Sequence, residues 1–154
     1  MNDFKRSTAK PKVRTENILV RLSAKLKYVV ELAARLDKTS QARIIEQAIE
    51  DLIDDPNGPL MLQRRDEAEP HNVFKETWNV DFYQRFINLA ADFPGLLLPE
   101  EEAIWQTINA RPADFFHQDG EDEDGYPRYT YVDADKVRAR WEELEQRAKL
   151  ITTR

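Results

Sequence analysis

Three residues near the N-terminus, Asn17, Leu19 and Arg21, have side chains suited to contacts with the edges of nucleic-acid bases. Arginine can pair with guanine, asparagine with adenine, and an apolar side chain can touch the methyl group of thymine. In an extended strand, side chains two residues apart lie on the same face. The spacing therefore predicts one strand that presents all three side chains together.

The sequence gives less support to catalysis or metal binding. The chain has no cysteine, only two histidines and four glycines, and no recognisable nucleophile or phosphate-cradling glycine loop. The acidic run from Asp119 to Thr130 has the length of a calcium loop. It has Asp124 where the sharp turn needs glycine and Thr130 where a bidentate glutamate belongs, so we interpret it as a solvated loop. We expect no enzyme activity, no cofactor and no metal.

The elements that would position the three residues form a strand followed by two helices. Over residues 17–22, Ile18, Val20 and Leu22 alternate with the three candidates, as in a half-buried strand. Ser23 and Ser40 are suitable N-caps, and each precedes an apolar stripe at helical spacing. The stripes consist of Leu26, Val29, Val30, Ala33 and Leu36, then Ile45, Ala48, Ile49, Leu52 and Ile53. The turn-forming residues 54–59 should end the second helix.

Charge is divided unevenly along the chain. The net charge is −6, but residues 1–43 hold 11 Lys and Arg against 4 Asp and Glu, a net charge of +7. Residues 44–154 hold the other 12 basic residues against 25 acidic ones, a net charge of −13. We expect the first part to meet a polyanion and the second to meet water, a protein or a basic surface.

A lone strand followed by two short helices needs a partner to pair its backbone and bury its apolar face. Two copies could pair their strands antiparallel and pack four helices against one face. Residues 16–53 resemble the ribbon-helix-helix family of repressors and antitoxins, the Arc and MetJ type of fold. The similarity lies in the alternating strand that ends in Leu22-Ser23, in Ala34 placed six residues before Ser40, and in the second apolar stripe.

The resemblance implies a homodimer in which Asn17, Leu19 and Arg21 face bases in the major groove of double-stranded operator DNA. It also implies that the amide end of the second helix, formed by residues 39–41 (Thr39, Ser40 and Gln41), grips a phosphate. Many family members have glycine in the turn between the helices, whereas this chain has Lys38, so we expect a strained left-handed backbone there.

The register of the strand has one alternative. Because Leu22-Ser23 fixes the end of the strand, we expect Leu19 to face outward. A slip by one residue would bury Leu19 and replace the base-facing set.

The predicted fold class is α+β, mostly α, with an N-terminal ribbon-helix-helix dimer and a separate, mainly helical C-terminal domain. Residues 1–14 are expected to form a disordered basic arm, in which Lys12 and Arg14 contact DNA. The ribbon-helix-helix domain should span 15–55 and a linker 56–77, in which residues 60–77 could instead form a short helix. An acidic domain over 78–154 should bind a partner or oligomerise.

Helices in the last part are expected after Asn79 or Asp81 as the cap, from Pro99, and after Asp133. A polar acidic loop should separate the second of these from a short strand over residues 128–132.

These expectations lead to a transcriptional repressor, specifically an antitoxin-like autoregulator whose acidic part binds a toxin. The alternative is a plasmid-type partition or DNA-transfer accessory protein whose second domain assembles dimers into higher oligomers on repeated sites. No apolar run approaches the length of about 18 residues that a membrane helix needs, so we expect a cytoplasmic protein without membrane contact.

Overall fold

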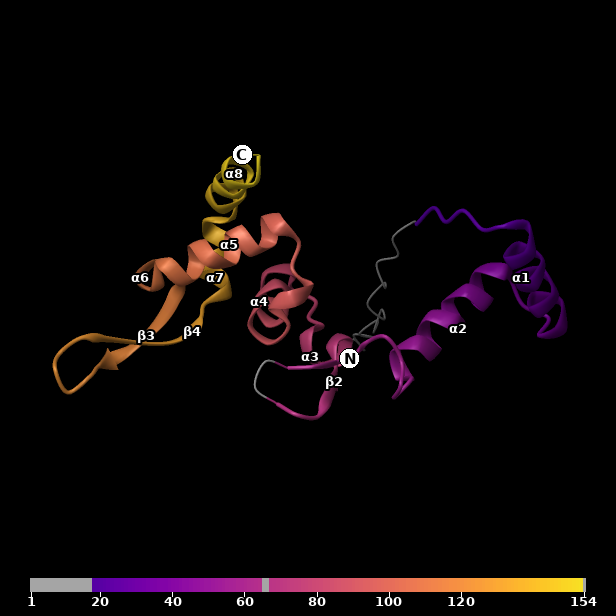
Figure 1. Cartoon of the computed structure of the whole chain (residues 1–154), viewed down its shortest axis with the longest axis horizontal. Helices are drawn as coiled ribbons and strands as arrows, with labels where there is room; N and C mark the ends of the chain where they lie inside the picture. The colour runs from indigo at the N-terminus through magenta and orange to yellow at the C-terminus, as the bar shows by residue number, and fades with distance from the viewer. Residues whose placement is uncertain (1–17, 65–66, 154) are drawn as a thin grey trace, which may run out of the picture. The chain divides into compact units, whose positions relative to one another are not determined.

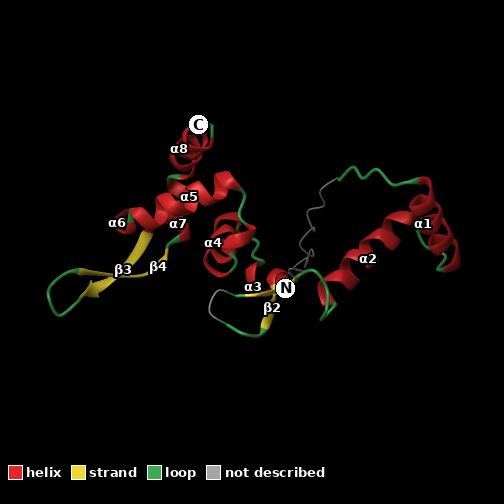
Figure 2. Cartoon of the chain, viewed as in Figure 1, coloured by secondary structure: helices red, strands yellow, loops and turns green. Residues whose placement is uncertain are grey.

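The computed structural model describes residues 18–64 and 67–153. These residues are mostly helical, with two small antiparallel sheets, which confirms the α+β, mainly α class (Figure 2). The chain divides into two compact units, residues 1–47 and 48–154, and the boundary falls within the second helix. Within the described residues, no helix combines the length and apolarity needed to cross a membrane.

The first two helices match the sequence prediction. α1 spans Ala24–Leu36, and the Ser23 hydroxyl accepts a hydrogen bond from the Leu26 N–H. α2 spans Gln41–Asp54, and the Ser40 hydroxyl accepts from the Arg43 N–H at 3.1 Å. Both serines therefore satisfy an N–H group that has no acceptor within its helix.

The turn between α1 and α2 contains the expected left-handed residue. Lys38 has φ +52°, and the Thr39 N–H donates to the Ala34 carbonyl at 3.0 Å. This hydrogen bond, from the second residue after the C-cap back into the last turn, is that of a Schellman motif.

Residues 56–77, predicted as a linker with a short helix as the alternative over 60–77, contain two short strands and a short helix. β1 (Met61–Gln63) and β2 (Pro70–Asn72) form an antiparallel pair, and α3 (Val73–Thr77) follows directly (Figure 1). Asn72 fixes this region to the end of α2, because its side-chain amide donates to the Ile53 carbonyl at 2.7 Å.

Two longer helices continue the second unit. α4 (Phe82–Asp92) is capped by Asp81, which accepts from two backbone N–H groups. A short 3-10 helix, η1 (Pro94–Leu96), leads to α5 (Pro99–Ala110), which begins at a proline as predicted. α6 (Pro112–Phe115) adds one further turn.

The end of the chain forms a hairpin and two helices. β3 (Phe116–Glu121) pairs with β4 (Pro127–Val132), so part of the predicted acidic loop is a strand. The predicted final helix is two helices, α7 (Ala134–Ala139) and α8 (Trp141–Thr152), separated at Arg140.

The hydrophobic core lies in the second unit. It is formed by buried side chains from α4, α5, α6, β4, α7 and α8, with Ile108, Phe115 and Val137 fully buried. The side chain of Ala34 is the one buried side chain among described residues 18–47. The first unit as a single chain therefore has almost no core of its own.

Candidate nucleic-acid interface

The segment that precedes α1 has neither helix nor strand in the single chain over residues 18–23. A strand needs hydrogen bonds from a neighbour, and the neighbour expected here is a second copy. Leu19 is 92% exposed and Arg21 is also exposed. Asn17, Lys12 and Arg14 lie outside the described residues.

The opposite side of this segment is also uncovered. Ile18 is 83% exposed and Val20 is 58% exposed, so both faces of the alternating segment are accessible in the single chain. The outward direction of Leu19 therefore stays a prediction.

The apolar stripe of α1 is partly exposed as well. Leu26, Val29 and Leu36 are exposed, whereas Val30 and Ala33 are half-buried. Apolar side chains at helical spacing on one face usually pack against another element. The helix is confirmed, and the packing of the exposed part of its stripe stays a prediction.

The N-terminus of α2 faces a hollow of about 590 Å³ in the first unit. The predicted phosphate-binding residues Thr39, Ser40 and Gln41 all line it. The Thr39 N–H donates to the Ala34 carbonyl, so a phosphate contact of Thr39 would use its hydroxyl group, and its role stays a prediction. Helix geometry leaves the amides at the start of α2, including that of Gln41, without intrahelical acceptors.

Two basic residues that sequence reasoning missed line the same hollow. Arg35 comes from the last turn of α1, and Lys38 is the left-handed residue of the turn. Glu31 is the acidic group of the lining, and its carboxylate lies 3.9 Å from the Lys27 amine. The signal that could have identified Arg35 is its position one turn before the predicted helix break.

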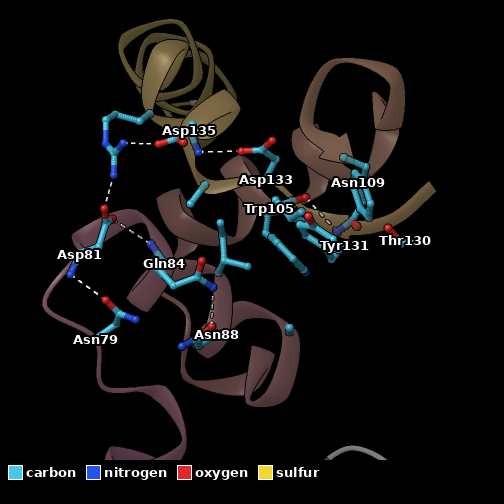
Figure 3. A pocket seen from close by; sticks show the side chains of 16 residues that line it. Asn79, Asp81, Gln84, Asn88, Trp105, Asn109, Thr130, Tyr131, Asp133 and Asp135 are labelled. Carbon is cyan, nitrogen blue, oxygen red and sulfur yellow. Dashed lines mark hydrogen bonds and ion pairs between the residues drawn. The ribbon is translucent and has the colours of Figure 1, made fainter. Parts of the chain in front are cut away.

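The second unit contains a polar cleft of about 900 Å³, shown in Figure 3. Asp81, Gln84 and Asn88, from α4 and the residue that caps it, form one side. Trp105 and Tyr131, from α5 and β4, lie on the other side. The sequence did not predict this cleft, because its residues come from five separate elements, α4, α5, β3, β4 and α7.

Hydrogen bonds within this cleft fix most of its polar side chains. The Gln84 amide donates to the Asn88 side-chain oxygen at 2.8 Å, and Arg138 pairs with Asp81 and Asp135. The backbone N–H of Gln84, followed by that of Tyr83 and by Arg138, holds the pKa of the Asp81 carboxyl below its ordinary value. Asp81 is therefore a capping and ion-pairing group here.

No three histidine, aspartate or glutamate side chains gather to hold a metal ion within residues 18–64 and 67–153. In comparisons with known proteins, the chain matches no family model, no curated protein sequence and no solved structure.

Proposed function

We propose that the chain is a DNA-binding transcriptional repressor that acts as a ribbon-helix-helix homodimer. In the dimer, residues 17–22 of two copies pair as an antiparallel ribbon that enters the major groove. Arg21 and Asn17 then contact base edges, and Leu19 contacts a thymine methyl group. Lys12 and Arg14 add contacts with phosphates.

The observation that carries the proposal is the exposure of apolar side chains in the first unit. Ile18 and Val20 in the alternating segment, together with Leu26 and Val29 in α1, are between 52% and 83% exposed. A monomer rarely leaves so many neighbouring apolar groups in water. A second copy would cover them and would pair the backbone of the strand in the same step.

The hollow at the start of α2 supports the DNA contact. An amide end carries partial positive charge and binds anions. Arg35 and Lys38 line this hollow, so a phosphate would meet two full positive charges in addition to the amides. Thr39, Ser40 and Gln41 keep their predicted roles in this proposal, and Lys38 and Arg35 add positive charge.

The acidic second unit supports an antitoxin-like function, in which a basic protein partner such as a toxin binds there. Its helices have a core of their own, which provides a preformed surface. The alternative is a partition or DNA-transfer accessory protein whose second unit joins dimers on repeated sites. A neighbouring gene that encodes a small basic protein would favour the first.

The test is DNA binding by the full chain and its Arg21→Ala variant. A preferred duplex is first selected from a random pool, and anisotropy is then measured on this duplex and on a scrambled one. Loss of a base-edge contact should weaken specific binding by about 1 to 3 kcal/mol, with a smaller effect on the scrambled duplex.

The matched control is Arg128→Ala, which removes an exposed arginine from β4 in the second unit. This variant should bind both duplexes like the unmodified chain. Equal weakening of both duplexes by Arg21→Ala would mean that the segment does not read sequence. Failure to select any duplex would contradict DNA binding itself.

A further inference from the structure

A second concave surface of the second unit, the α5–α8 groove, differs in chemistry from the polar cleft. It has a volume of about 740 Å³ and lies between the first turns of α5 and one side of α8. Its apolar lining includes Phe82, Leu98 and Trp141, with Ile104 and Ala148 almost fully buried.

The apolar groups at the edge of the α5–α8 groove are accessible. Leu98 is 64% exposed and Phe82 is 47% exposed. The rings of Phe82 and Trp141 form a T-shaped pair, with centroids 5.2 Å apart and planes at 90°. Exposed apolar and aromatic groups around a preformed hollow are typical of the anchor sites of protein interfaces.

The length of the groove fits a helix. On α8 its lining follows one helical stripe, from Trp141 through Glu145 and Lys149 to Thr152. These 12 residues correspond to about 17 Å along the axis, or three turns. An amphipathic helix of similar length could lie along this stripe and place apolar side chains at i, i+4 and i+7 into the groove.

The charges around the groove indicate which residues should flank the apolar face of such a helix. Glu100, Glu101 and Glu145 line it against one amine, that of Lys149. Glu101 already accepts the Leu98 N–H, and Glu145 accepts the Trp141 indole N–H, so both carboxylates are held in place. Held carboxylates beside an apolar groove favour lysine and arginine at the edges of the bound helix.

We propose that the α5–α8 groove binds a basic amphipathic helix of a partner protein. This inference deepens the partner-binding part of the proposed function and does not depend on DNA binding. The apolar face of the helix covers Phe82, Leu98 and Trp141, and its basic residues face Glu100 and Glu145. The acidic charge of the second unit as a whole attracts such a partner.

The probe is a 14-residue peptide of leucine and lysine, with leucines at i, i+3, i+4, i+7 and i+11. A second peptide replaces every lysine by glutamate. Binding to the full chain is followed through the indole N–H signals of its three tryptophans, assigned with Trp78→Phe and Trp105→Phe variants. Trp141 lines the groove, whereas Trp105 lines the polar cleft and is an internal control.

We expect the lysine peptide to shift the Trp141 signal and leave that of Trp105 nearly unchanged. The glutamate peptide should bind at least tenfold more weakly. Equal binding of the two peptides, or a larger shift at Trp105 than at Trp141, would overturn the proposal. A Trp141 signal that shifts on dilution without peptide would assign the groove to a second copy of this chain instead.

Two variants test the anchors without endangering the fold. Leu98→Ser removes an exposed apolar group at the N-cap of α5, where serine is a favourable residue, so the helix should persist. It should weaken lysine-peptide binding about tenfold, and Glu100→Lys should weaken it several-fold. The matched control Glu123→Lys, in the turn between β3 and β4, should have no effect.

Unchanged affinity in both groove variants would contradict the assignment. These measurements contain no DNA and leave Arg21 intact. A failure here is therefore distinguishable from a failure of the proposed DNA-binding function.

Discussion

Lys38 occupies a backbone region that is unfavourable for any residue with a Cβ atom. Its φ of +52° lies in the left-handed region, which costs such a residue about 1 to 2 kcal/mol. Lys38→Gly should therefore stabilise the α1–α2 turn by about 1 kcal/mol at fixed chain concentration. Hydrogen exchange of the α1 and α2 amides, measured with increasing urea, checks this prediction.

The same substitution should weaken DNA binding, because Lys38 lines the hollow proposed to hold a phosphate. One lost phosphate contact per subunit lowers the salt dependence of binding on specific and random duplexes alike. Lys38→Ala is the control, since it removes the same charge but keeps the Cβ atom. A glycine variant that is no more stable than the alanine variant would contradict the inference that the backbone at Lys38 is strained.

Two carboxyl groups of the second unit should make its stability depend on pH. The pKa of Asp81 is lowered chiefly by the Gln84 N–H, and the pKa of Glu143 is lowered chiefly by the Arg111 side chain. Their ordinary values are 3.8 and 4.5. A lowered pKa in the folded state stabilises the fold above the ordinary value, and this contribution is lost as pH falls through the folded value.

The melting temperature of the second unit should therefore decrease when the pH is lowered below about 4.5, the ordinary pKa of Glu143. Tryptophan fluorescence is the readout, because all three tryptophans lie within residues 48–154. Asp81→Asn should reduce this pH dependence, whereas Asp119→Asn, on exposed β3, should not. An identical pH profile for Asp81→Asn and the unmodified chain would contradict the assignment.

Single residues with local roles were the most predictable from the sequence. Ser23, Ser40, Asp81 and Asp133 cap helices as expected, because capping depends on neighbours within three residues. The hydrogen bond from the Thr39 N–H that closes the turn after Lys38 was not predicted, and the phosphate contact of Thr39 stays a prediction. The roles of Asn17 and Arg21 depend on a second copy and stay predictions.

At the scale of elements, α5 is central to the second unit, where it packs against α6 and α8. Ile108 lies at the centre of the core and is fully buried. Ile108→Ala should destabilise the second unit by about 2 to 5 kcal/mol, because it removes buried apolar surface and leaves a cavity. Urea unfolding followed by tryptophan fluorescence measures this change.

The exposed Leu98→Ala substitution is the control and should change stability by less than about 0.5 kcal/mol. Because α1 lies in the other compact unit, its hydrogen exchange should be little affected by Ile108→Ala. An equal loss of protection in α1 would show that the two units unfold as one.

Elements with strong periodicity and clear end signals were predicted well, and elements made by pairing were not. α1, α2, α4 and α5 each have a cap or proline at the start and an apolar stripe. β1 and β2 have only three residues each, too few for an alternating pattern. The break at Arg140 was hidden because Val137, Trp141 and Leu144 keep one continuous helical spacing across it.

At the scale of the whole molecule, the first unit should exist only as a dimer. Val20→Asp would place a carboxylate in the proposed interface, where burial of an unpaired charge is strongly unfavourable. Sedimentation at several concentrations should find a dimer for the unmodified chain and a monomer for this variant. Arg21→Asp, on the proposed outer face, should remain dimeric.

Loss of the dimer in Arg21→Asp but not in Val20→Asp would show that the register is slipped by one residue. A dimer in both variants would contradict the proposed interface. The register decides the whole site, because a one-residue shift exchanges the two faces of a strand.

The division of the molecule was visible in the sequence as an uneven charge distribution, but its position was not. The compact units meet at residues 47 and 48, within α2, whereas the expected domain ended at residue 55. Contacts from Asn72 and Lys75 to Ile53 and Asp54 account for this difference. Such contacts link residues about 20 positions apart and leave no local pattern.

The uncovered apolar surface of the first unit has a consequence for the amount of chain in a cell. If a second copy covers this surface, chains at low concentration are mostly monomers. Their unpaired segment is then accessible to proteases. At high concentration the chains form dimers, which are degraded more slowly. Occupancy of an operator would then rise with the square of the chain concentration while single chains predominate. The response to dosage would therefore be steeper than that of a monomeric repressor, even at one isolated operator.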